Sequence, residues 1–202
     1  KYSLNTVDIC PVGALTSKDF RFRQRVWYLQ EAKTICTSCS TGCNVTAYYN
    51  EEGMWRVRPR LNEKVNGYWM CDEGRDVYKY VNKKSRLLTA KITKGTQIEA
   101  MEAGAAMKKL APSMKALGDK VALVLTGQYT NEEYEAILQT FAGEMKSKQV
   151  YHWINNPDQL NEFDGLLLRG DRNPNTQGLK AILEKNGIKS SWDDLSKKIQ
   201  SG

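Results

Sequence analysis

The chain has 202 residues, of which 41% are hydrophobic and 26% are charged, a composition typical of a globular protein with an apolar core. The formal net charge is +7, but 23 acidic residues are interleaved with the 30 basic ones. The densest basic runs, 21–25 and 83–86, match no groove-reading motif. We therefore expect no nucleic-acid binding, and interpret these runs as solvated faces or as a docking surface for an acidic partner. No segment has the roughly 20 consecutive apolar residues of a membrane-spanning helix, so any membrane association is expected to be indirect.

The first half of the chain has the features of a small β-rich structure. A turn-like segment surrounds Pro11 and Gly13, and the alternation of basic and aromatic residues at 20–29 predicts an extended strand. Because the chain starts at a lysine and no signal-like apolar run follows, we expect the amino end to have been cut. Residues 44–49 and 54–58 are rich in β-branched and aromatic residues and flank a short glycine-containing turn, which predicts a β-hairpin.

From about residue 87 the pattern changes to alternating strands and helices. Short continuous apolar runs predict strands buried on both faces, at 121–125, 150–154 and 165–168. Apolar residues at helical spacing predict helices at 98–110, 131–145 (with Asn131 as a cap), 177–185 and 191–199. The β–α–β order predicts a parallel sheet. The expected fold is therefore α+β to α/β, with a small β-rich module packed on a small doubly wound parallel-sheet domain.

Four of the five cysteines predict an iron–sulfur site. Cys36, Cys39 and Cys43 have the spacing C-x2-C-x3-C, and Cys71 follows beyond the predicted hairpin. Three thiolates on a loop of small residues can bind three corners of one cube, while the returning hairpin supplies the fourth ligand. Ligation by four cysteines is the usual requirement of a [4Fe–4S] cluster, so we predict that these four residues bind one.

Two other interpretations of the cysteines remain open. Zinc sites with four cysteine ligands usually present two short C-x2-4-C pairs, whereas the division in this chain is three plus one. Disulfides are typical of secreted chains, and nothing marks this chain as secreted. The spacing favours a cluster over both alternatives.

The segments TICTSCSTGCNV (34–45) and VNGYWMCDEGR (65–75) resemble the iron–sulfur module of molybdopterin-type oxidoreductases. Their particular residues resemble the G subunit of bacterial NADH:quinone oxidoreductase (complex I). Two further segments strengthen that resemblance, DICPVGAL (8–15) and DGLLLRGDRNPN (164–175). The resemblance implies three parts: the tail of an upstream ferredoxin-like domain (1–29), the [4Fe–4S] module (30–86), and a small or truncated α/β domain (87–202).

The same resemblance implies a function and a set of partners. The chain is expected to be an electron-transfer subunit or fragment, relaying one electron at a time, without substrate chemistry of its own. Its expected partners are other peripheral-arm subunits of complex I, which would place it in the cytoplasm, at the inner membrane only through the complex. The alternative is a fragment of a molybdenum-dependent formate dehydrogenase-like catalytic subunit. Molybdopterin enzymes typically have a lysine where this chain has Glu73, so no molybdopterin is expected.

Several other residues are interpreted more simply. The resemblance implies that Cys10 is a ligand of a second cluster only together with an upstream domain, and a free thiol without it. His152, in an apolar run, is expected to be structural. Trp27, Trp55 and Trp69 are expected to exclude water from the cluster.

Overall fold

The computed structural model describes residues 1–201, which divide into two compact units. Residues 1–84 and 154–176 form the first unit, and residues 85–153 form the second together with the chain from residue 177 onward. Residues 154–176 were predicted to belong to the α/β part, but this segment returns to the first unit. No helix in the described residues is long and apolar enough to cross a membrane.

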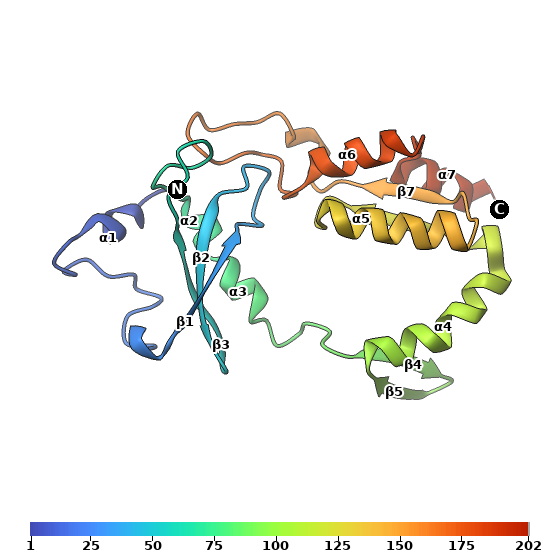
Figure 1. Cartoon of the computed structure of the whole chain (residues 1–202), viewed down its shortest axis with the longest axis horizontal. Coiled ribbons are helices and arrows are strands. Elements are labelled where there is room, and N and C mark those ends of the chain that lie inside the picture. The colour runs from blue at the N-terminus through green and yellow to red at the C-terminus, as the bar shows by residue number, and fades with distance from the viewer. Residues whose placement is uncertain (202) are drawn as a thin grey trace. The chain divides into compact units, whose positions relative to one another are not determined.

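The first unit is built on a three-stranded antiparallel sheet in the order β1-β2-β3 (Figure 1). Its strands are β1 (Gln30–Ile35), β2 (Asn44–Asn50) and β3 (Gly53–Pro59). The predicted hairpin of β2 and β3 is confirmed. The strand predicted at 20–29 is wrong, because that stretch forms turns and a 3-10 helix, η1 (Val26–Tyr28), and pairing with β2 begins only at Gln30.

Short helices and two carboxylates fasten the amino-terminal segment to the chain around Cys71. These helices are α1 (Asn5–Ile9), α2 (Asp72–Arg75) and α3 (Val77–Val81). The Asp72 carboxylate accepts hydrogen bonds from the backbone N–H groups of Ser3 (2.9 Å) and Leu4 (3.0 Å). The Asp8 carboxylate lies 2.6 Å from Arg75, which is buried. The start of the chain is therefore part of the cysteine-bearing unit.

The second unit contains the predicted β–α–β arrangement. Strands β6 (Leu123–Thr126) and β7 (Val150–Trp153) pair in parallel, and α5 (Asn131–Leu138) connects them, continuing as a π-helical turn, η3 (Gln139–Glu144). Helices α6 (Thr176–Lys185) and α7 (Trp192–Ser201) follow. The core joins β6, β7, α5 and α6 and contains Leu125, Tyr134, Leu138, Phe141, Val150, Leu179, Ile182 and Leu183. The α+β class is confirmed, with a two-stranded parallel sheet among the described residues.

Two details of the second unit differ from the predictions. The N-cap of α5 is Thr130 rather than Asn131, because Thr130 and Glu133 form a reciprocal capping box. Residues 98–101 are not helical: β5 (Gln97–Met101) pairs with β4 (Ala90–Lys94), and the helix α4 (Ala103–Leu117) begins after them. Gly95, at φ 59°, provides the tight turn between these two strands. A 3-10 turn, η2 (Gly118–Lys120), follows α4.

Candidate functional site

The four cysteines of the predicted site are all buried, at 7% exposure or less. Cys36, Cys39 and Cys43 lie in the loop between β1 and β2, and Cys71 is the N-cap of α2. None of them forms a disulfide. Among residues 1–201, no three His, Cys, Asp or Glu side chains lie as close together as the ligands of a single metal ion.

The loop between β1 and β2 is closed by backbone hydrogen bonds between its cysteines. The N–H of Cys36 donates to the carbonyl of Cys43 at 2.8 Å, which extends the strand pairing by one step. Gly42 has φ 65°, a left-handed conformation that favours glycine, and its N–H donates to the carbonyl of Cys39. The small residues of this loop therefore allow a tight turn that carries three thiols.

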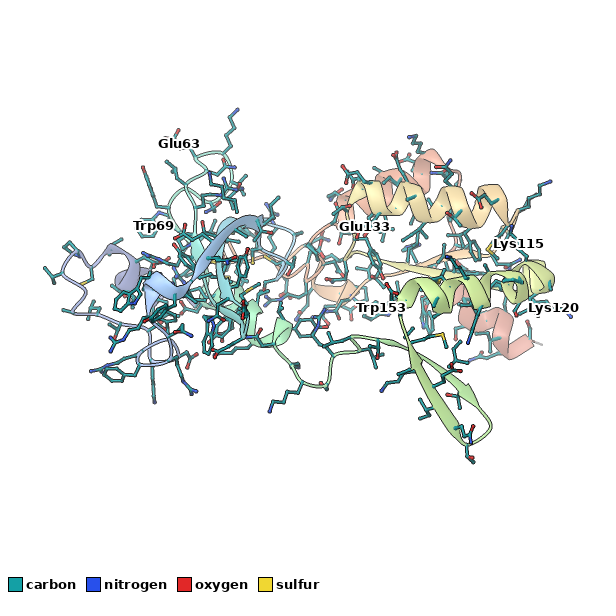
Figure 2. The ribbon with its side chains drawn as sticks, turned by 60° about the horizontal axis from the view of Figure 1, so that its bottom comes forward. Glu63, Trp69, Lys115, Lys120, Glu133 and Trp153 are labelled. Atoms are coloured by element: carbon teal, nitrogen blue, oxygen red, sulfur yellow. The ribbon has the colours of Figure 1, made fainter. Side chains whose placement is uncertain are left out.

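The segment that returns from β3 brings Cys71 to the same place. Figure 2 marks this segment by Glu63 and Trp69. Its buried Asn66 accepts a hydrogen bond from the N–H of Asn44 at 2.9 Å, and therefore ties the segment to the start of β2. Asn5 holds Met70 through hydrogen bonds to both its N–H and its carbonyl.

Gly74 lies between the sulfur atoms of Cys71 and Cys36. Its N–H donates to the Cys71 Sγ at 3.3 Å, and a Cβ at this position would lie 2.9 Å from the Cys36 Sγ. Hydrogen bonds from backbone N–H groups to ligand sulfurs are a known means of tuning a cluster. The absence of a side chain at residue 74 therefore leaves room for two of the four sulfurs, and these residues fit an iron–sulfur cluster.

Gly74→Ala is expected to weaken cluster retention, because the added methyl group would displace the Cys36 sulfur or the Met70 side chain. We expect iron loss to a chelator to be several-fold faster than in the unsubstituted chain. Gly104→Ala is the matched control, since a Cβ at this helical glycine would meet no atom within 4 Å. Equal rates of iron loss in both variants would contradict the steric role of Gly74.

Apolar side chains cover the four cysteines in two groups. Val45, Val57 and Met70 pack with Cys36 and Cys43. On the other side, Leu168 packs with Cys39 and Cys71, with Tyr2 against them. These packed groups exclude water from the sulfur atoms.

Two of the three tryptophans expected to perform this role do not. Trp27 is 73% exposed and Trp69 is 47% exposed. Trp55 is partly buried and donates a hydrogen bond from its indole N–H to Asn50 at 2.8 Å. The expectation of water exclusion is therefore wrong for Trp27 and Trp69.

The burial of the thiols also shifts their proton affinity. The pKa of Cys36 is raised to about 11 and that of Cys43 to about 12, mainly because burial removes the thiols from water. The pKa of Cys71 is raised for the same reason. The negative charges of the neighbouring cysteines add to each shift, because all four sulfurs interact within one site. As free thiols these groups keep their protons near neutral pH, and iron binding must replace protons with metal–thiolate bonds.

A third segment of the chain, which was predicted to belong to another domain, completes the site. The N–H of Ser40 donates to the carbonyl of Asp171 at 3.0 Å, and the Thr41 hydroxyl donates to the carbonyl of Leu167. Both contacts join the cysteine loop to residues 164–176, which we call the cover loop. Between β7 and this loop lies the 3-10 turn η4 (Pro157–Gln159).

The strand predicted at 165–168 within the cover loop is wrong. The Asp164 carboxylate accepts hydrogen bonds from the N–H groups of Leu166, Leu167 and Leu168, at 3.0–3.1 Å, which curls the segment into a compact turn. Tyr2 donates a hydrogen bond to the same carboxylate at 2.6 Å. The local sequence signal for this turn was Asp164 directly before Gly165, since aspartate and glycine are both common in turns.

Cys10 belongs to neither of the two apolar groups around the four cysteines. Backbone N–H groups surround its sulfur, that of Leu15 contributing most, and they lower the pKa of this thiol. His152 donates one hydrogen bond from its Nδ1–H to the Ser190 carbonyl at 2.9 Å, a contact within the second unit that agrees with a structural role.

Comparison with known proteins agrees with this geometry. Residues 29–83 match the family model of the molybdopterin oxidoreductase Fe4S4 domain, which confirms a [4Fe–4S] cluster as the cofactor. The chain is 37% identical over 133 residues to NADH-quinone oxidoreductase subunit 3 of Thermus thermophilus, covering 65% of this chain and 17% of the relative. It is 37% identical to the G subunit of the Pseudomonas putida enzyme (48% of this chain, 11% of the relative) and 36% identical to the G subunit of the Escherichia coli K12 enzyme (57% and 13%).

The chain spans 17% or less of the length of these relatives. The family match covers the three-stranded sheet, all four cysteines of the site and the chain through α3. The resemblance to the G subunit is confirmed as well. The chain is therefore similar to a portion of the G subunit of NADH-quinone oxidoreductase, and its residues 29–83 match the molybdopterin oxidoreductase Fe4S4 domain.

Proposed function

We propose that this chain is an electron-transfer component of an NADH:quinone oxidoreductase, with its [4Fe–4S] cluster bound by Cys36, Cys39, Cys43 and Cys71. The observation that carries the proposal is the burial of all four thiols among two apolar groups, with Gly74 leaving room for the sulfurs of Cys36 and Cys71. When bound, the cluster supplies a one-electron carrier. No acid–base or nucleophilic chemistry is assigned to this chain.

The protein's contribution is to hold, shield and orient the cluster. Four thiolates would bind the irons, the Gly74 N–H would donate to the Cys71 sulfur, and the aliphatic side chains around the site would keep water away. Low solvent access and hydrogen bonds to sulfur are the means by which a protein sets a reduction potential. The cover loop belongs to this shell because Leu168 packs against Cys39 and Cys71.

Partners and location follow from the relatives and are part of the same proposal. The relatives are named as subunits of NADH-quinone oxidoreductase, so we infer that this chain binds other subunits of such a complex. It would meet the inner membrane from the cytoplasmic side, through that complex. The division into a ferredoxin-like tail (1–29), a cluster module (30–86) and an α/β part (87–202) remains a proposal for the larger protein.

Iron and sulfide analysis tests the proposed function directly. Anaerobically reconstituted protein is expected to be brown, with about four irons and four sulfides per chain. A colourless protein that binds one zinc and no sulfide under the same conditions would instead support the zinc alternative. Molybdenum and pterin analysis of the protein purified with its partners separates the formate dehydrogenase-like alternative, which requires both.

A further inference from the structure

Glu73 forms an ion pair across the first unit. Its carboxylate lies 2.6 Å from the guanidinium of Arg172, which the cover loop carries. Glu73 is half-exposed, at 48%, whereas Arg172 is more buried, at 27%. The two residues are 99 positions apart in the sequence, so only the return of the cover loop brings them together.

The backbone around Arg172 is fixed on both sides. The buried Asp171 carboxylate accepts hydrogen bonds from the Asn173 N–H (3.1 Å), the Asn173 side chain (2.8 Å) and the Thr176 hydroxyl (2.9 Å). Asn173 is fully buried and exchanges two further hydrogen bonds with the backbone of Asn155. Arg172 therefore projects from a loop whose neighbouring residues have little freedom to move.

The ion pair lies beside one proposed ligand. Glu73 is two residues after Cys71, on the helix that Cys71 caps. The carbonyl of Asp171, directly before Arg172, accepts a hydrogen bond from the N–H of Ser40 in the cysteine loop. The negative charge of Glu73 and the positive charge of Arg172 therefore both lie beside this part of the site.

We propose that Arg172 is a positioning residue that raises the reduction potential of the cluster by compensating the charge of Glu73 beside Cys71. Reduction adds one electron, and hence one negative charge, to a cluster already surrounded by four thiolates. A fixed positive charge favours that added charge, and an unpaired carboxylate opposes it. This inference rests on the proposed four-cysteine cluster.

The test is a redox titration of the reconstituted chain with dithionite as electron donor, followed by electron paramagnetic resonance at low salt. Arg172→Gln is expected to disfavour reduction by about tenfold in the equilibrium constant, which is about 59 mV more negative for a one-electron couple. Glu73→Gln is expected to shift the potential in the opposite direction, and the double variant to return near the original value. Low ionic strength is needed because salt screens partly exposed charges.

Two control variants separate charge from structure. Arg169→Gln removes an exposed positive charge from the same loop, where its guanidinium lies over the Phe163 ring, and is expected to leave the potential unchanged. Arg172→Lys keeps the charge and is expected to restore most of the potential lost in Arg172→Gln. If Arg172→Gln fails to hold its cluster, Glu73→Gln still tests the sign of the effect.

The outcomes distinguish this inference from the proposed function. Shifts of opposite sign in chains that retain four irons would support the role of Arg172. Shifts of the same sign, or no shift, in such chains would overturn it and leave the cluster assignment intact. A parent chain that binds no iron would overturn the proposed function, and this inference with it.

Discussion

Cys39→Ser is expected to lower the iron content from about four per chain to near zero, because a serine hydroxyl is a poor replacement for a thiolate ligand. Cys39 is buried at 5% exposure and packs with Cys71 and Leu168. Because apolar side chains and another ligand surround it, we expect no other side chain to replace it as a ligand. The measurement is iron and sulfide per chain after anaerobic reconstitution. Four irons in this variant would remove Cys39 from the ligand set.

The same substitution is expected to destabilise the first unit. Apart from the cysteines, the apolar groups around the site contain few fully buried side chains, so metal–thiolate bonds must supply much of the cohesion. Amide hydrogen exchange in residues 30–84 should therefore become faster, while the second unit, with its own core, should be unaffected. Cys10→Ser is the matched control, and its iron content is expected to equal that of the parent chain.

Asp171→Ala is expected to lower the free energy of unfolding of the first unit by about 3 kcal/mol. The substitution removes a buried carboxylate oxygen that accepts three hydrogen bonds and leaves their donors without that acceptor. Loosening of the cover loop should also move Leu168 away from Cys39 and Cys71. Iron release in air is therefore expected to become several-fold faster.

Asp158→Ala is the control for this effect, because it removes an exposed carboxylate from the 3-10 turn that precedes the cover loop. Its stability and its rate of iron release are expected to match those of the parent chain. Chemical denaturation of both variants, with a probe in each unit, measures the difference. Equal stability of Asp171→Ala and Asp158→Ala would show that the Asp171 network is not needed to hold the loop.

Local sequence signals were sufficient where a structure depends on neighbours along the chain. The hairpin of β2 and β3 followed from two β-branched and aromatic runs around a short turn. The cysteine loop followed from its spacing, since three cysteines within eight residues must lie close together in one loop. The parallel pairing of β6 with β7 followed from two apolar runs separated by one helix.

The cover loop shows why the remainder could not be predicted. Its three leucines form a continuous apolar run, which is also the pattern of a buried strand. Only Leu168 is buried, however, and Leu166 is 67% exposed, because hydrogen bonds to Asp164 curl the chain between them. Those bonds are supported by Tyr2, 162 residues away, and no local pattern reports a contact of that range.

The first unit is made of two stretches of the chain that are separated in the sequence, so its parts are synthesised at different times. Cys71 leaves the ribosome about a hundred residues before the Asp171 network and Thr176, and translation at about 5–20 residues per second makes that interval about 5–20 seconds. Throughout it, all four thiols are present but lack the segment that shields Cys39 and Cys71. A nascent chain at this stage is open to oxygen and to competing metals, so the delivery of iron and sulfide is best delayed until the cover loop has been made.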